Sequence, residues 1–112
     1  MTARDLTRFL RAVQAGRLLS PESTGYFFTP RALYRDRETW KKMYGPGLWF
    51  HVGNDATILF YEKEGSNAGT SGMVRHYPAR DATLVLLCNM QDAAWGPAEQ
   101  VHEMLLAGDL DG

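Results

Sequence analysis

The stretch GLWFHVGNDATILFYEKEGSNAGTSGMVRHYPARDATLVLLCNM, residues 47–90, decides the fold. It alternates runs of aromatic and β-branched residues with glycine, asparagine, aspartate and proline, a pattern typical of strands joined by tight connections. The expected strands are residues 47–53, 57–63, 70–78 and 82–90. Residues 53–56 and 78–82 have the composition of hairpin turns, so neighbouring strands should be antiparallel. The stretch therefore predicts an antiparallel β-sheet of about four strands.

Helical patterns flank this stretch on both sides. Residues 2–16, TARDLTRFLRAVQAG, carry an apolar stripe, with Thr2 as the N-cap and Gly16 as the left-handed stop. A second, short helix is expected to begin at residues 20–21, where a capping serine precedes a proline. Residues 97–108, PAEQVHEMLLAG, form the last expected helix. Because both apolar stripes need cover, the first and last helices are expected to share one face of the sheet, which gives an α+β fold.

The segment between these patterns, residues 31–43, is rich in basic residues. It reads RALYRDRETWKKM, with Tyr34 and Trp40 interleaved among the charges, which superficially resembles a nucleic-acid patch. Asp36 and Glu38 dilute the positive charge that phosphate binding requires. We therefore interpret the segment as a solvated loop or helix face, and expect no nucleic-acid partner.

Length, composition and charge limit the remaining possibilities. A chain of 112 residues with 45% apolar residues is sufficient for a single domain, which we place at residues 1–112. Twelve basic and thirteen acidic residues give a net charge of -1, so nothing global attracts the chain to nucleic acid or to an anionic membrane. The sequence contains neither an apolar run long enough to span a membrane nor a signal-peptide pattern, which predicts a soluble chain and leaves its compartment open.

The glycine-rich segment at residues 63–72, KEGSNAGTSG, invites two chemical interpretations that its spacing excludes. A phosphate loop places its lysine after the glycines, whereas Lys63 precedes them. A nucleophile elbow needs Gly-x-Ser-x-Gly, and around Ser71 the position of the second glycine is taken by Met73. Neither a phosphate site nor a nucleophilic Ser71 is therefore favoured.

The metal-binding residue types are also scattered. His51 and His76 fall on different expected strands, and His102 falls on the last helix, so no close-spaced ligand pair exists. Cys88, the single cysteine, lies in the most apolar strand and is interpreted as a buried, inert thiol. We expect no metal and no cofactor.

The order of the pieces along the chain is more informative than any single motif. The pieces are TARDLTRFLRAVQAG (2–16), LLSPES (18–23), TPR (29–31), YGPGLWF (44–50), a Lys-x-Gly (63–65), GTSG (69–72), HYPARDATLVLLCN (76–89) and a final amphipathic helix. Together they resemble the C-terminal part of the superfamily of serine β-lactamases, penicillin-binding proteins and related esterases, nearest its class C-like branch. The resemblance covers nearly the whole chain and implies an incomplete β-lactamase-like fold.

The resemblance also implies a substrate-binding wall. In that superfamily the lysine of a Lys-Thr/Ser-Gly element lies on the strand at the edge of the active-site cleft, and Lys63-Glu64-Gly65 matches this element. By this match Lys63 would bind or polarise the substrate, and Gly65 would leave room for it against the strand. The backbone N–H of Ser66 would be one oxyanion-hole donor, which stabilises charge developing on an acyl carbonyl. The alternative is a lysine at the end of a strand, before a glycine turn, without a catalytic role.

Two departures from the superfamily pattern matter. No serine is followed by a lysine three residues later, and no Tyr-x-Asn element occurs, so the nucleophile and its assistant are missing from this sequence. We therefore expect the C-terminal part of a serine hydrolase that acts on an ester, peptide or β-lactam in the complete protein and is inactive alone. The negative charge of Glu64 should disfavour β-lactams, whose carboxylate it would repel. A non-catalytic binding or assembly module that retains the scaffold is the alternative.

The last expected strand, Ala82 to Met90, implies a partner. In the complete superfamily fold the corresponding strand pairs with an N-terminal strand. Without that neighbour its backbone donors and acceptors lie open beside an apolar run, and such edges seek another strand. We expect the chain to self-associate through this strand, or to dock there onto the N-terminal part of the parent protein.

Overall fold

The structure, a computed structural model, describes residues 2–107, apart from the side chains of residues 66, 67, 106 and 107. Its elements in chain order are α1 (Ala3–Gln14), α2 (Pro21–Phe27), β1 (Ala32–Asp36), β2 (Trp40–Tyr44), β3 (Trp49–Gly53), β4 (Ile58–Asn67), β5 (Thr70–Tyr77), a 3-10 turn (Pro78–Arg80), β6 (Ala82–Cys88) and α3 (Trp95–Ala107). The strands form one sheet in the order β1-β2-β3-β4-β5-β6, with every neighbouring pair antiparallel. The predicted α+β class is confirmed, but the sheet has six strands, so the expectation of about four is wrong.

The two additional strands, β1 and β2, come from the basic segment that we interpreted as a loop or helix face. All five residues of β1 are exposed, so the segment lacks the apolar alternation that marks a half-buried strand. The hairpin is instead held by backbone pairing and by side chains on one face. There Tyr34 packs against Trp49 with 4.8 Å between ring centroids, and the Lys42 ammonium lies 4.8 Å from the Trp49 ring.

The N-terminal helices begin where the sequence predicted. The Thr2 hydroxyl accepts a hydrogen bond from the Asp5 N–H, and the Asp5 carboxylate accepts one from the Thr2 N–H, so both parts of a capping box are present. Gly16 follows α1 with φ of +74°, a left-handed conformation that glycine adopts without strain. The Ser20 hydroxyl caps α2 by accepting from the Ser23 N–H.

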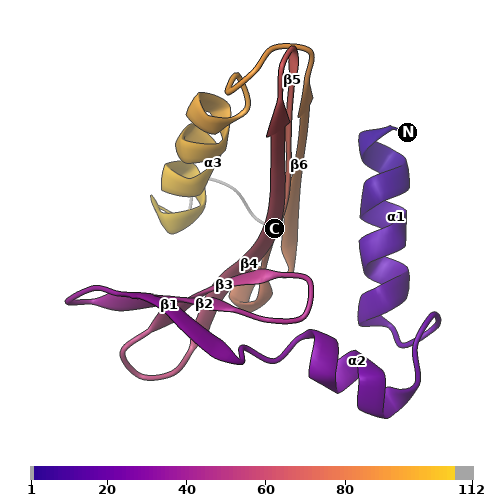
Figure 1. The fold of residues 1–112 in the computed structure, drawn as a ribbon, viewed down its shortest axis with the longest axis vertical. Coiled ribbons are helices and arrows are strands. Elements are labelled where there is room, and N and C mark those ends of the chain that lie inside the picture. The colour runs from indigo at the N-terminus through magenta and orange to yellow at the C-terminus, as the bar shows by residue number, and fades with distance from the viewer. Residues whose placement is uncertain (1, 108–112) are drawn as a thin grey trace.

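The helices α1 and α3 cover opposite faces of the sheet (Figure 1). On one face Leu10 of α1 belongs to a buried cluster with Phe50 and Tyr61, and on the other Leu105 of α3 packs with Phe60. The expectation that the two helices share a face is therefore wrong. Successive residues of a strand point to opposite faces, and both Phe60 and Tyr61 are buried. The sheet thus requires an apolar cover on each side.

Strand β4 is longer than its neighbour β3, and this difference creates an open edge. The β3–β4 pairing ends at Trp49 opposite Glu62, whereas the β4–β5 pairing continues to Asn67 opposite Thr70. Within residues 2–107, residues 63–67 of β4 therefore have a strand on one side and none on the other. No helix in these residues is long and apolar enough to cross a membrane.

Candidate functional site

The residues of the Lys-x-Gly element lie on this open edge, but their side chains diverge. Lys63 pairs with Val74 and lines a cavity between α1 and the sheet. Glu64 pairs with Met73 and lines a second cavity, beneath α3. The two side chains thus lie on opposite faces of the sheet, because adjacent residues of a strand point to opposite faces. The expected repulsion of a substrate carboxylate by Glu64 stays a prediction, and it concerns a ligand that reaches past the strand edge to the Glu64 side.

Lys63 has no compensating charge among the residues that the structure describes. Its side chain is exposed at the rim of its cavity, and it makes no hydrogen bond or ion pair with any residue that the structure describes. Its cross-strand partner is the apolar Val74, and Gly65, two residues further along the strand, has no side chain. An ammonium in these surroundings is available to an external anion or to a polarised carbonyl.

A patch of bare backbone lies next to Lys63. Gly65 pairs with Gly72, so two facing positions of β4 and β5 carry no side chain. A Cβ added at Gly65 would meet no atom within 4 Å, which means that the space above the strand is open. Ser66 follows, with its backbone opposite Ser71. Lys63, Gly65 and Ser66 therefore occupy consecutive parts of an accessible strand edge.

The cavity beside Lys63 has a volume of about 220 Å³. Its apolar lining comes from α1, the end of α2, the segment before β3, and β5: Leu6, Phe9, Leu10, Val13, Phe27, Leu48 and Val74. Gly47 completes the lining, and a Cβ there would lie 3.0 Å from the Phe27 ring. A side chain at position 47 would therefore clash with the Phe27 ring at the end of α2 unless that ring moved.

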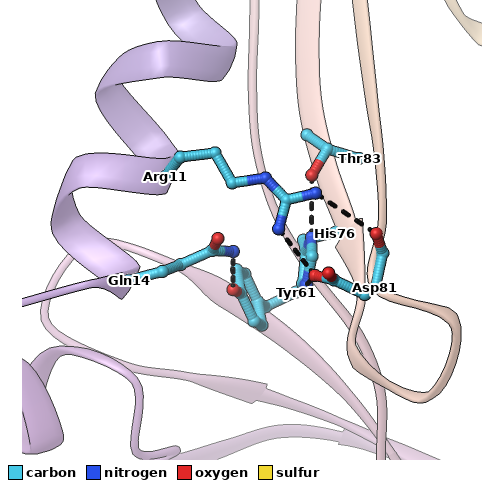
Figure 2. A network of polar contacts seen from close by, with 6 residues as sticks. All are labelled: Arg11, Gln14, Tyr61, His76, Asp81 and Thr83. Atoms are coloured by element: carbon cyan, nitrogen blue, oxygen red, sulfur yellow. Dashed lines mark hydrogen bonds and ion pairs between the residues drawn. The ribbon is translucent and has the colours of Figure 1, made fainter.

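A polar network further along the same face fastens α1 to the sheet (Figure 2). Its members are Arg11, Gln14, Tyr61, His76, Asp81 and Thr83. The Arg11 guanidinium donates to the Asp81 carboxylate at 2.6 Å and to the Asp81 carbonyl at 3.2 Å. The Gln14 amide donates to the Tyr61 hydroxyl, and His76 Nδ1 lies 2.8 Å from the Thr83 hydroxyl. No sequence pattern indicates this network, because Arg11 and Asp81 are 70 residues apart.

The network shifts the titration of its members. The hydrogen bond and charge of Arg11 lower the pKa of Asp81. Burial lowers the pKa of His76, and the neighbouring Arg11 charge lowers it further, while Asp81 opposes the shift. At neutral pH the His76 ring is therefore uncharged beside the ion pair.

We expect the free energy of unfolding to fall between pH 7.5 and pH 5.5. Burial lowers the pKa of each histidine below the ordinary value of 6.5: His51, His76 and His102. Below pH 6.5 the unfolded chain thus binds more protons than the folded chain, which favours unfolding. The pKa of Asp81, lowered from 3.8, lies outside this window. Urea unfolding at the two pH values measures the change.

A His76→Gln variant is the control for this prediction. It removes one titrating group, so its loss of stability between pH 7.5 and pH 5.5 should be smaller than that of the unchanged chain. A midpoint that is the same or higher at pH 5.5 would contradict the proposed effect of burial.

The other candidate residues from the sequence, Ser71, His51 and His102, make contacts within the fold. Ser71 is buried, and its hydroxyl donates to the Met90 carbonyl at 2.9 Å and accepts from the Ala94 N–H at 3.1 Å. This residue thus anchors the segment leading to α3. His51 stacks on Trp40, and His102 Nδ1 lies 2.7 Å from the Tyr77 hydroxyl. Among residues 2–107, no group of three or more His, Cys, Asp or Glu is arranged to hold a metal ion.

Comparison with known proteins gives a likeness of fold. No protein-family model matches the chain, and no curated protein matches its sequence. Among solved structures, the chain is similar to a penicillin binding protein from Bacillus halodurans, with a TM-score of 0.83 and 23% sequence identity. The match covers 93% of this chain and 30% of that one, so the chain spans less than a third of the matched structure. The fold is therefore that of part of a penicillin-binding-protein-like structure.

Proposed function

We propose that this chain supplies one wall of the active-site cleft of a serine acyl hydrolase. The observation that carries the proposal is the open edge of β4. There the Lys63 ammonium, unpaired within residues 2–107, lies next to the bare backbone at Gly65. The fold likeness supports it, since the matched structure is a penicillin binding protein. The substrate is an ester, peptide or β-lactam.

The wall has three parts with different roles. Lys63 binds or polarises the substrate through its positive charge, and Gly65 lets the substrate lie against the strand. The backbone N–H of Ser66 donates to the carbonyl oxygen as it becomes negative. A serine on another polypeptide segment attacks the carbonyl carbon, the alcohol or amine leaves with a proton, and water then releases the acid.

The attacking serine is the part that this sequence lacks. No serine has a lysine three residues later, and the hydroxyl of the buried Ser71 is occupied by two backbone groups. The chain alone should therefore give no burst of product with an activated ester or a chromogenic β-lactam. Inspection of the gene ahead of residue 1 for Ser-x-x-Lys identifies the missing polypeptide. We call the mixture of that polypeptide with this chain the complemented hydrolase. The complemented hydrolase should turn substrate over.

The exposed sheet edge at β6 favours a second candidate function, assembly with another chain. The two edge strands of the sheet differ: β1 is five residues long, contains Arg35 and Asp36 and has an irregular register, which discourages pairing. β6 is seven residues long, and its sequence ATLVLLC contains no charge. Leu87 in this strand is 49% exposed. We propose that β6 pairs with a strand of a second copy or of the missing polypeptide.

Sedimentation velocity tests the pairing of β6. The unchanged chain should sediment as a dimer or larger species, and Leu87→Lys should shift it to monomer, because a charge on an edge strand opposes pairing. Leu33→Lys is the matched control, since Leu33 lies on the other edge strand and is 56% exposed. A well-folded monomer of the unchanged chain would contradict self-association.

Substitution of Lys63 distinguishes a binding module without catalysis from a cleft wall. In a binding module the substitution would leave the biological activity unchanged.

A further inference from the structure

We propose that the cavity between α1 and the sheet receives the apolar acyl chain of the substrate. The substrate class is then an ester or amide of a medium-length carboxylic acid. This inference rests on the proposed function, because it places the chain of the substrate next to the wall that would hold its carbonyl group.

The size of the cavity selects the length of the acyl chain. An apolar cavity of about 150 Å³ stays dry and accommodates benzene. The cavity beside Lys63 has a volume of about 220 Å³, which leaves room for an apolar group of about six to eight carbon atoms by the same measure. Seven apolar side chains line it, so a chain that enters gains the free energy of removing its surface from water.

Buried side chains and polar contacts hold α1, which forms one wall of the cavity, against the sheet. Leu10 and Val13 anchor α1 in the core, where both are buried. The Arg11–Asp81 contacts and the hydrogen bond from Gln14 to Tyr61 hold the C-terminal half of the helix to the sheet. A preformed cavity binds more tightly than one that must first be ordered.

The aromatic side chain of Phe9, at the rim of the cavity, is exposed to solvent. Phe9 is 59% exposed, although it lines the same cavity as the buried Leu10. A large aromatic side chain in this position is available to cover a ligand, since burying it gains free energy.

The charge at the rim specifies the polar end of the ligand. Lys63 is the one charged residue among the described residues that line the cavity, and it has no partner among them. An apolar ligand with a carboxylate or a polarised carbonyl at one end satisfies both the lining and the ammonium. The bare backbone at Gly65 leaves space for that end. A purely apolar segment of another protein would leave Lys63 uncompensated.

Direct binding of octanoate to the chain tests this inference without any hydrolysis. Titration calorimetry should show binding of octanoate, and Lys63→Met should weaken it about fivefold, the range of an accessible ion pair. Octanol lacks the charge, so its binding should not respond to Lys63→Met. Lys42→Met is the matched control, because Lys42 lies over Trp49 and lines no part of this cavity.

A second variant fills the cavity. Leu6→Trp, at a half-buried position of the lining, should weaken both octanoate and octanol at least tenfold, whereas Leu19→Trp, outside the lining, should weaken neither. Circular dichroism should be used to check that each variant is folded. If Leu6→Trp does not fold, the comparison of octanoate binding between the unchanged chain and Lys63→Met still tests the inference. Absence of octanoate binding, or equal octanoate affinity in Lys63→Met, overturns the inference.

The test separates this inference from the proposed function. Octanoate binding without turnover by the complemented hydrolase would support the cavity and contradict the hydrolase. Turnover of short activated esters without octanoate binding would support the hydrolase and contradict the acyl-chain cavity.

Discussion

Replacement of Lys63 by methionine is expected to lower the kcat of the complemented hydrolase about 100-fold. The loss of one preorganised group that stabilises developing negative charge typically costs between about 100-fold and 1000-fold in kcat. Lys63 has no other partner among the described residues, so its charge is available for this role. Steady-state kinetics with an activated ester measures the change. The stability of the chain should be unaffected, because the side chain is exposed.

The control for this experiment lies on the opposite face of the sheet. Lys42 is a strand lysine whose ammonium lies 4.8 Å from the Trp49 ring. Lys42→Met should leave kcat unchanged. If Lys63→Met were as active as Lys42→Met, Lys63 would be a strand-end lysine without a catalytic role, and the proposed cleft wall would lose its charged group.

Replacement of Arg75 by methionine is expected to destabilise the chain by about 3–5 kcal/mol. The Arg75 guanidinium contacts the Glu62 carboxylate at 2.6 and 2.8 Å, and the two side chains are only 12% and 8% exposed. Without Arg75 the Glu62 carboxylate would remain buried and uncompensated. A domain of this size has a total stability of about 5–15 kcal/mol, so a large fraction would be lost. Urea unfolding measures the difference.

Two further variants show whether the loss comes from the orphaned charge. The double variant Glu62→Leu with Arg75→Met removes both charges and should recover most of the stability, because replacing a whole buried pair by apolar residues is often neutral. Arg11→Met breaks an exposed pair with Asp81 and should cost at most about 1 kcal/mol. Equal losses for Arg75→Met and the double variant would mean that packing, not charge, explains the effect.

The parts of the fold that the sequence predicted depend on local signals. Thr2, Ser20 and Gly16 act within a few residues of their own helices, and the hairpin turns at 53–56 and 78–82 join strands that are neighbours in sequence. Local hydrogen bonds and backbone preferences determine such features. They could therefore be identified without tertiary contacts.

The parts that it missed depend on tertiary structure. The β1–β2 hairpin has a fully exposed strand, so its sequence carried no burial pattern. The placement of α1 and α3 on opposite faces follows from the burial of both Phe60 and Tyr61, which becomes informative only when the strand is known to lie centrally in the sheet. The ion pair between Arg11 and Asp81 joins distant segments and leaves no sequence pattern.

The order of motifs along the chain predicts the candidate site, whose surroundings only the fold supplies. The match to a Lys-x-Gly element predicts Lys63, Gly65 and Ser66, and the open edge of β4 gives them an accessible setting. Glu64 lies on the opposite face from Lys63, as the period of a strand requires for adjacent residues. The apolar cavity, in contrast, combines side chains of α1, α2 and β5 and could not be predicted from one segment.

The most direct test of the central claim is to locate the acyl group in the complemented hydrolase. The mixture is incubated with a slowly hydrolysed activated ester, quenched in acid, and the intact mass of each polypeptide is measured. We predict that the acyl mass appears only on the polypeptide with Ser-x-x-Lys, and that the mass of this 112-residue chain stays unchanged. A stoichiometric acyl adduct on this chain would contradict the claim that it forms a cleft wall without the nucleophile.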